Sequence, residues 1–301
     1  MLCTIFFITL ECTFIYTIFT EPFFLDREIR AGFDLFHTRE DHQTSSSFDS
    51  KKTGGRLRSS YLLTEDLTQG WVYTLKSEKV EDVSSTASQL IRDQSGKKTL
   101  SQIGHYLTID RRDSRFNPTE GYYGQIATDI AGLGGSTKHV RNVVKGMKYY
   151  PIADKITFSL KGSVGYVVGL GDDVILSERF NVGGESIRGF ATAGIGPRDK
   201  TTYDALGGEW MYTSSAQVEF PLGLPEDYDI KGRLFTDLGS LSQISPSSSV
   251  VTDDKTLRIS AGTGITWVSP FGPIGLDLGF PLVKGDIDQV EHIRMNFGTR
   301  F

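Results

Sequence analysis

The clearest pattern in the chain is an alternation of apolar and polar residues with a period of two. It runs through 156–168, 257–267 and 274–282, so that neighbours such as Arg258 and Ile259 point to opposite faces of an extended strand. The runs are about ten to twelve residues long, whereas globular strands average ~5–6 residues and a tilted membrane-crossing strand needs ~9–11. One face is apolar and the other carries Gly, Ser and charged residues. This combination favours a barrel with lipid outside and water inside. The barrel must close, because hydrocarbon offers no hydrogen-bond partner to the backbone groups of an open sheet edge.

The predicted fold class is therefore all-β, an antiparallel transmembrane β-barrel. Turn residues such as Asn117-Pro118 separate the strands. A coarse count gives about 12–13 strands. Strands are predicted at 27–40, 55–65, 69–79, 100–111, 121–132, 138–150, 156–168, 209–220, 230–240, 257–268, 274–284 and 291–301, with 5–19 as one further strand.

Residues 1–20 form an apolar N-terminal segment with no clear targeting signature. A secretory signal needs a basic start and a small-residue cleavage site, but the first basic residue is Arg27. Glu11 interrupts the run, and its Thr, Ile and Phe residues suit a strand better than a helix. We interpret 1–20 as a partial membrane strand or a mis-started N-terminus, and 21–301 as the barrel domain.

Composition and charge exclude several classes of protein. The chain has 33 Gly, 19 Phe and 12 Tyr among 301 residues. Its mean hydropathy of −0.21 argues against a bundle of membrane helices, each of which needs ~18 or more consecutive apolar residues. The net charge of −5 argues against a nucleic-acid partner.

The longest connection between predicted strands, 169–208, has the composition of an ordered loop. Connections far longer than ~15 residues are usually functional or disordered. This one carries Phe180, Val182, Ile187 and Phe190 among several glycines. We therefore predict a folded loop rather than a flexible one.

Several motifs in and around this loop resemble those of the bacterial surface antigen family, the BamA-type outer-membrane assembly factors and their secretion relatives. The tetrapeptide Ile187-Arg188-Gly189-Phe190 follows a Gly-Gly pair, as in that family. The resemblance covers about residues 20–301 and is nearest to alphaproteobacterial members. Its other motifs, in family order, are AGLGG at 131–135, GIGPRD at 194–199, EFPLGLPE at 219–226, LFTDLGS at 234–240, WVSPFGP at 267–273 and the terminal Phe301.

The resemblance implies a large antiparallel barrel in the bacterial outer membrane, of about sixteen strands. It also implies that 169–208 is a lumenal loop whose Arg188 pairs with the wall carboxylates Glu219 and Asp237. Strand parity agrees, because Asp237 shares a face with Arg233, while Leu234 points the other way. Such a contact would be charge-assisted and would hold the loop in place.

The last strand also resembles a family feature, the C-terminal signal by which assembly machinery recognises barrel clients. Phe297 and Phe301 share one face of the strand 291–301, which ends on an aromatic residue. An exposed strand edge of this kind is open to pairing with another strand.

No motif in the sequence indicates an enzyme, a metal site or a cofactor. The five histidines are scattered, no G-x-S-x-G is present, and the Gly-rich runs lack a P-loop Lys-Ser/Thr pair. The resemblance implies an outer-membrane barrel assembly and insertion factor. The partners implied are outer-membrane lipids, unfolded barrel clients and assembly lipoproteins. The alternative is an outer-membrane secretion translocator or passive pore.

The chain departs from the family in what precedes the barrel. The family carries periplasmic POTRA modules there, and counting strands back from Phe301 makes 27–40 about the fifth strand of the barrel. We therefore expect a truncated form that lacks the POTRA modules and the first strands.

Overall fold

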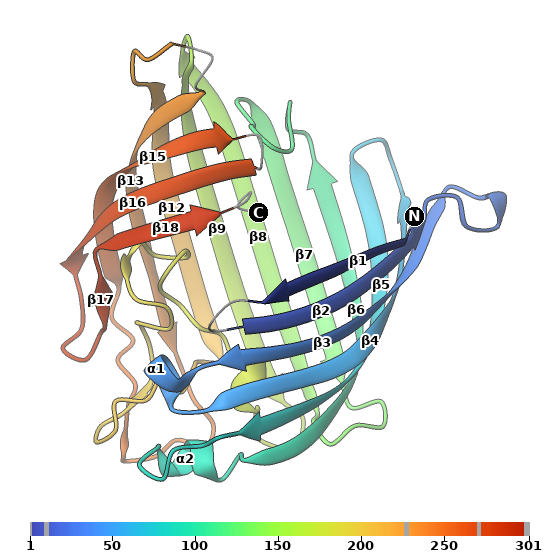
Figure 1. Ribbon diagram of the computed structural model, residues 1–301, viewed down its shortest axis with the longest axis vertical. Helices are drawn as coiled ribbons and strands as arrows, with labels where there is room; N and C mark the ends of the chain where they lie inside the picture. The colour runs from blue at the N-terminus through green and yellow to red at the C-terminus, as the bar shows by residue number, and fades with distance from the viewer. Residues whose placement is uncertain (1, 9–11, 226–228, 270–271, 298–301) are drawn as a thin grey trace.

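The computed structural model describes residues 2–8, 12–225, 229–269 and 272–297. Within them, one antiparallel sheet of 14 strands dominates the molecule and curls about an axis, so that its first and last strands both come to the front of Figure 1. Each strand pairs with the next long strand in sequence. The strands are β1 (Leu2–Ile8), β2 (Cys12–Glu21), β3 (Ile29–Asp41), β4 (Asp49–Leu62), β5 (Leu67–Glu81), β6 (Gly96–Asp110), β7 (Gly121–Ala131), β8 (His139–Ala153), β9 (Ile156–Gly169), β12 (Trp210–Pro221), β13 (Ile230–Ser242), β15 (Arg258–Ser269), β16 (Gly272–Val283) and β18 (Ile293–Phe297).

The remaining elements are short and belong to the connections. They are η1 (Phe24–Asp26), α1 (Gln43–Ser46), α2 (Gln89–Arg92), η2 (Leu176–Glu178), β10 (Gly189–Phe190), β11 (Arg198–Asp199), β14 (Val251–Thr252) and β17 (Val290–Glu291). Among the described residues, no helix has the length and apolar character needed to cross a membrane.

The all-β antiparallel architecture predicted from the alternation is confirmed, with two differences of detail. The apolar stretch 5–19, predicted as one strand, belongs to two paired strands, β1 and β2, which brings the sheet to 14 strands. A stretch of 20 residues is long enough for two short strands, because one crossing needs only ~9–11 residues. In addition, β4 begins at Asp49 rather than at 55, because its polar first residues continue the ladder with β5.

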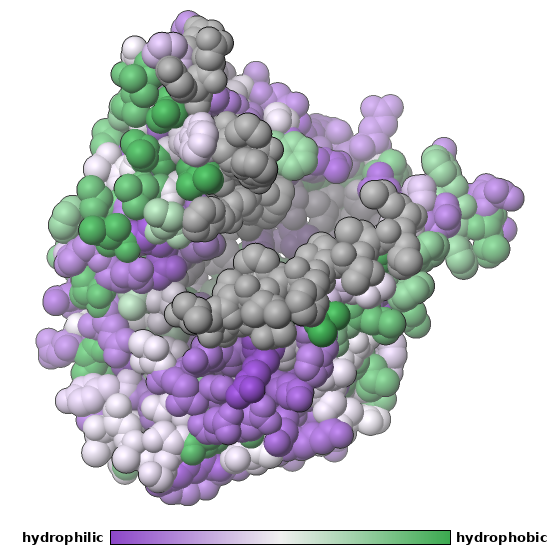
Figure 2. Space-filling model, in the orientation of Figure 1, coloured by the Kyte–Doolittle hydropathy of each residue, from purple (hydrophilic) through white to green (hydrophobic). Residues whose placement is uncertain are grey.

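The two faces of the sheet differ in the way that the alternation predicted. Large apolar side chains on the outer face are exposed, and Figure 2 shows hydrophobic residues gathered over the outside of the strands at its left edge. Charged and polar strand residues face inward and are buried. The exposed apolar residues of the outer face include Leu57, Trp71, Ile126, Val144, Leu160, Leu234, Ile265 and Leu278. The buried polar and charged residues of the inner face include Asp34, Glu78, Arg233, Asp237, Arg258, Ser260 and Asp277. Exposed apolar side chains and buried charges are the reverse of a soluble protein, and are typical of a membrane barrel wall.

The buried apolar core is formed by the connections rather than by the outer face. One cluster joins the β9–β12 connection to the inner wall and contains Val167, Val174, Phe180, Val182, Ile187, Phe190, Ile195 and Leu241. A second cluster joins loops at the lower end of Figure 1 and contains Phe48, Val80, Ile91, Leu176, Leu206, Ile244 and Val251. The inside of the curved sheet is therefore packed with folded chain.

Candidate functional site

The connection between β9 and β12 folds back against the inner face of the sheet. Its own antiparallel bridges, Phe180 with Gly208 and Val182 with Ile195, give it a hairpin-like form. Two short ladders tie it to other parts of the chain, because β10 pairs with β17 and β11 pairs with β14. Ile187 and Phe190 are fully buried in the first apolar cluster. The motif residues between them are thereby held in a fixed position.

Arg188 is buried, and its side chain is surrounded by partners on the inner wall. Its Nε donates to Asp237 Oδ2 at 2.7 Å and its Nη2 donates to Asp237 Oδ1 at 2.7 Å, a bidentate pair. The backbone N–H of Arg188 donates to the same Oδ2 at 3.0 Å. The guanidinium also stacks on Phe235, with its carbon 3.4 Å from the ring centroid. Both charges are shielded from water, so removal of either partner would leave the other buried and uncompensated.

Glu219, predicted as the second carboxylate partner of Arg188, does not contact it directly. Arg188 Nη1 donates to Gln217 Oε1 at 2.7 Å, and Gln217 Nε2 donates to Glu219 Oε1 at 2.8 Å. Ser215 accepts a further bond from Arg188 Nη2 at 3.0 Å. Glu219, Gln217 and Ser215 share the inner face of β12, but the guanidinium lies against Ser215 and Gln217, in the middle of the strand. All three side chains point to the inner face, and their position along the strand decides which of them contact Arg188.

Asp277 on β16 extends the site towards the last strand. Its Oδ1 accepts from Arg233 Nε at 2.7 Å and lies 3.8 Å from Arg188 Nη1. Its Oδ2 accepts from Asn296 Nδ2, on β18, at 3.0 Å. Sequence reasoning missed Asp277, although its place on the polar face of an alternating strand was a usable signal. The loop motif and the edge strand are thus joined through one carboxylate.

Gly189 lets the loop lie directly on the wall. It adopts φ +90°, and a Cβ there would come within 3.1 Å of the backbone of Gly279 on β16. A Cβ on Gly279 would in turn lie 2.6 Å from the Gly189 nitrogen. This pair of glycines allows two backbones to approach more closely than any side chain would permit.

The loop has a second anchor near its start, which the sequence did not reveal. Lys76 Nζ, from β5, donates to Glu178 Oε1 at 2.7 Å, and His139 Nε2, from β8, lies 3.7 Å from Glu178 Oε2. Burial alone raises the pKa of Glu178, but the charge and hydrogen bond of Lys76 outweigh it and hold that pKa below its usual value. Two separate ion pairs therefore fix the loop to the wall, one on β5 and one on β13.

The predicted C-terminal strand is present as β18, with Phe297 opposite Ile274 of β16. Phe301 lies outside the described residues. The free side of β18 is an edge of the sheet, since the ladder order runs from β1 to β18, with no pairing between these two strands among the residues described.

The arrangement anchors the loop to the wall through charges and hydrogen bonds. Within the described residues, no group of three or more His, Cys, Asp or Glu side chains could hold a metal ion. The site defines a class of protein: a membrane barrel wall whose interior holds a folded loop, anchored through a buried arginine.

The chain belongs to the Omp85 superfamily, whose domain matches residues 15–301. It is 32% identical over 278 residues to the outer membrane protein assembly factor BamA of Neorickettsia risticii, covering 92% of this chain and 37% of that protein. BamA of Neisseria meningitidis is 25% identical, over 94% of this chain and 41% of the relative. The mouse sorting and assembly machinery component 50 homolog is 28% identical, over 73% of this chain and 49% of that protein. The chain thus spans less than half the length of these relatives.

A solved structure has the same fold. BamA of Haemophilus ducreyi lacking POTRA domains 1–3 superposes with a TM-score of 0.83 at 19% identity, covering 95% of this chain and 61% of that one. CdiB of Acinetobacter baumannii gives a TM-score of 0.61 at 11% identity, covering 94% and 49%.

Proposed function

We propose that this chain is the barrel part of an outer-membrane assembly factor, which helps other barrel proteins to fold and insert in the bacterial outer membrane. We assign 21–301 to one barrel domain, with 169–208 as its lumenal loop. The names of its BamA relatives support this proposal, as does the confirmed barrel-wall architecture.

The observation that carries the proposal is the anchored loop. The buried pair of Arg188 and Asp237, together with the apolar packing of Ile187 and Phe190, keeps folded chain against the inner wall. An open pore would need that space for solvent. A filled interior instead suits a scaffold that acts through its wall and its edge strands.

In the proposed mechanism, the edge of β18 offers unpaired backbone groups to an incoming client strand. A strand edge is a template for β-pairing, and hydrocarbon favours pairing because unsatisfied backbone groups are costly there. The proposed partners are lipids, unfolded barrel clients and assembly lipoproteins. The proposed lumenal motif is Ile187–Phe190 with its partner Asp237, and Phe297 and Phe301 form the proposed terminal-strand signal.

Insertion of a client into liposomes tests the function. The chain is refolded into liposomes, and an outer-membrane barrel protein unfolded in urea is added as the client. The amount of client that becomes protease-protected and heat-modifiable is then measured over time. We expect faster insertion than in empty liposomes, and a loss of most of that gain in Arg188→Ala. A rate equal to that of empty liposomes would contradict the proposal.

Planar-bilayer recording addresses the alternative function. The filled interior leads us to expect small and intermittent currents from the chain. A large, steady conductance together with slow client insertion would instead favour a secretion translocator or passive pore.

A further inference from the structure

A second feature of the inner face borders the contacts of the loop motif and shares Gln217 with them. The β6–β7 connection, 111–120, folds against the inner wall and closes a cavity of about 120 Å³. Asp113 stiffens this connection, since its carboxylate accepts bonds from Ser114, Thr119 and Glu120 within the turn. The cavity therefore has one wall of folded turn and one of strands.

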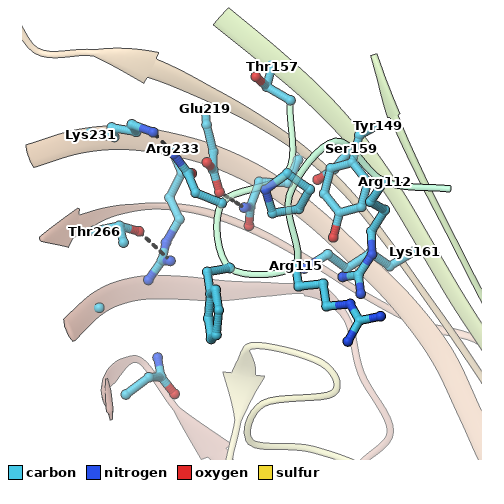
Figure 3. Close-up of a pocket in the computed structure, with 16 residues that line it drawn as sticks. Arg112, Arg115, Tyr149, Thr157, Ser159, Lys161, Glu219, Lys231, Arg233 and Thr266 are labelled. Atoms are coloured by element: carbon cyan, nitrogen blue, oxygen red, sulfur yellow. Dashed lines mark hydrogen bonds between the residues drawn. The ribbon is translucent and has the colours of Figure 1, made fainter. Parts of the chain in front are cut away.

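The side chains that line this cavity carry an excess of positive charge. Figure 3 shows Arg112, Arg115 and Lys161 on one side of it, and Lys231, Arg233 and Glu219 on the other. Glu219 is the one carboxylate among the lining residues. Two further carboxylates pair with cations of the lining, Asp110 with Arg112 and Asp277 with Arg233. Counted over the described residues alone, the five lining cations still outnumber these three carboxylates.

Three of the cations are held in place by contacts behind the lining or within it. Asp110 accepts from Arg112 Nε at 2.8 Å and from its Nη2 at 3.0 Å, and the guanidinium lies 5.0 Å from the ring centroid of Tyr123. Arg233 donates to Thr266 at 2.7 Å. Lys231 Nζ donates to the neutral amide oxygen of Asn117 at 3.1 Å. Pre-positioned cations gain more from an anion than mobile ones, because little side-chain entropy is lost on binding.

Hydroxyl groups complete the lining, from Tyr149, Thr157, Ser159 and Thr266. Guanidinium groups and hydroxyls are the donors that proteins use for phosphate oxygens. Positive charges gathered between low-dielectric walls also concentrate small anions. A larger cavity of about 530 Å³ adjoins this one, shares Lys161 and Gln217 with it, and gives an anion a route along the inner face.

We propose that this cavity binds a small multivalent oxyanion of the phosphate class. The cavity borders the Arg188 anchor, with which it shares Gln217, but Arg188 is not among its lining residues, and the proposal does not depend on the assembly function proposed above. The phosphate group belongs either to a free anion or to a lipid headgroup that reaches the inner face.

The test is a titration of the full chain, refolded in phosphate-free detergent, with inorganic pyrophosphate by calorimetry and ³¹P NMR. We expect saturable binding, weakened at least tenfold in the double variant Arg115→Gln, Lys231→Gln. The matched control is Lys51→Gln, Lys97→Gln, which removes two exposed charges near the starts of β4 and β6, at the end of the sheet remote from the 111–120 connection, and should change the affinity less than twofold. Should the double variant not refold, Arg115→Gln alone serves, since the Arg115 side chain is 72% exposed, and it should weaken binding at least threefold.

Two results overturn the site: the absence of saturable binding, and equal weakening in the cavity and control variants, which would indicate general charge attraction. Succinate binding as tightly as pyrophosphate would overturn the phosphate assignment in favour of carboxylates. Nanodiscs of phosphatidylglycerol and of phosphatidylcholine separate the two sources. Competition by the former alone supports a lipid headgroup, and equal pyrophosphate binding in both supports a free anion.

Discussion

At the scale of single residues, the molecule depends on charges buried in a polar interior. Arg188 uses both sides of its guanidinium, Nε and Nη2 on Asp237 and Nη1 on Gln217. Phe235 covers its face. Removing one member of such a group leaves the other buried without its charge partner, which costs more than the pair contributes.

The first prediction concerns this pair. We expect Arg188→Ala to lower the free energy of unfolding by about 3–5 kcal/mol, because Asp237 would stay buried and uncompensated. Arg188→Lys should recover only part of the loss, since an ammonium cannot reproduce the bidentate geometry. Urea unfolding in lipid vesicles measures both, with Arg30→Ala, at an exposed position on β3, as the control. Equal stability of Arg188→Ala and the control would show that the pair does not hold the loop.

The second prediction follows from Glu178. Its pKa lies below the usual 4.5, so its ion pair with Lys76 stabilises the fold above that value and loses its effect as the pH falls through the lowered pKa. We expect Glu178→Gln to lower the melting temperature at pH 7, with the difference from wild type shrinking steadily below pH 4.5. Differential scanning calorimetry at several pH values measures this. A difference that stays constant down to about pH 3, well below the pKa of a free Glu, would contradict this prediction.

At the scale of elements, the loop and the last strand are linked. β10 pairs with β17, which directly precedes β18, and Arg294 of β18 donates to Thr192 of the loop at 3.0 Å. Asp277 adds a further link through Asn296. A displacement of the loop would therefore loosen the edge strand as well, because both share the same backbone and side-chain contacts.

The third prediction tests that link through a glycine. Gly189→Ala should cost about 1–3 kcal/mol, because its φ of +90° is strained for alanine and the new Cβ would press on Gly279. We expect faster hydrogen exchange in both 187–191 and 293–297. The control is Gly146→Ala on β8, where a Cβ would meet nothing within 4 Å. Faster exchange in the loop with an unchanged β18 would separate the two elements.

At the scale of the whole molecule, the wall presents apolar side chains outward and charges inward, so lipid is the solvent of its outer face. Ile126 is 57% exposed at the middle of β7. Thr213, on the inner face of β12, borders the larger cavity. The two positions have similar strand conformation but opposite surroundings.

The fourth prediction uses this contrast. Ile126→Lys should destabilise the folded chain in lipid vesicles by about 2–4 kcal/mol, the cost of a cation on the lipid face near the bilayer centre. Thr213→Lys should cost far less, because its ammonium can be hydrated in the cavity. Urea titration in vesicles measures both. Similar costs at the two positions would mean that the outer face does not meet lipid.

Much of this molecule could be read from local pattern. A period of two decides which side chains share a face, so the strands, the apolar outer face and the inward direction of Asp237 and Glu219 followed from the order of residues alone. The N-terminal segment was harder, because an apolar stretch of that length fits either one strand or a hairpin.

Other features depended on how distant strands are placed. Register along β12 decides that Gln217, and not Glu219, meets Arg188, although both point inward. The contact of Glu178 with Lys76 joins residues about a hundred positions apart, and the charged cavity is lined by residues from seven strands and a turn. Alternation determines the face of a strand because it is a property of the extended backbone. Contact also depends on the position of a residue along its strand and on the path of the loop, and only the tertiary structure determines these two.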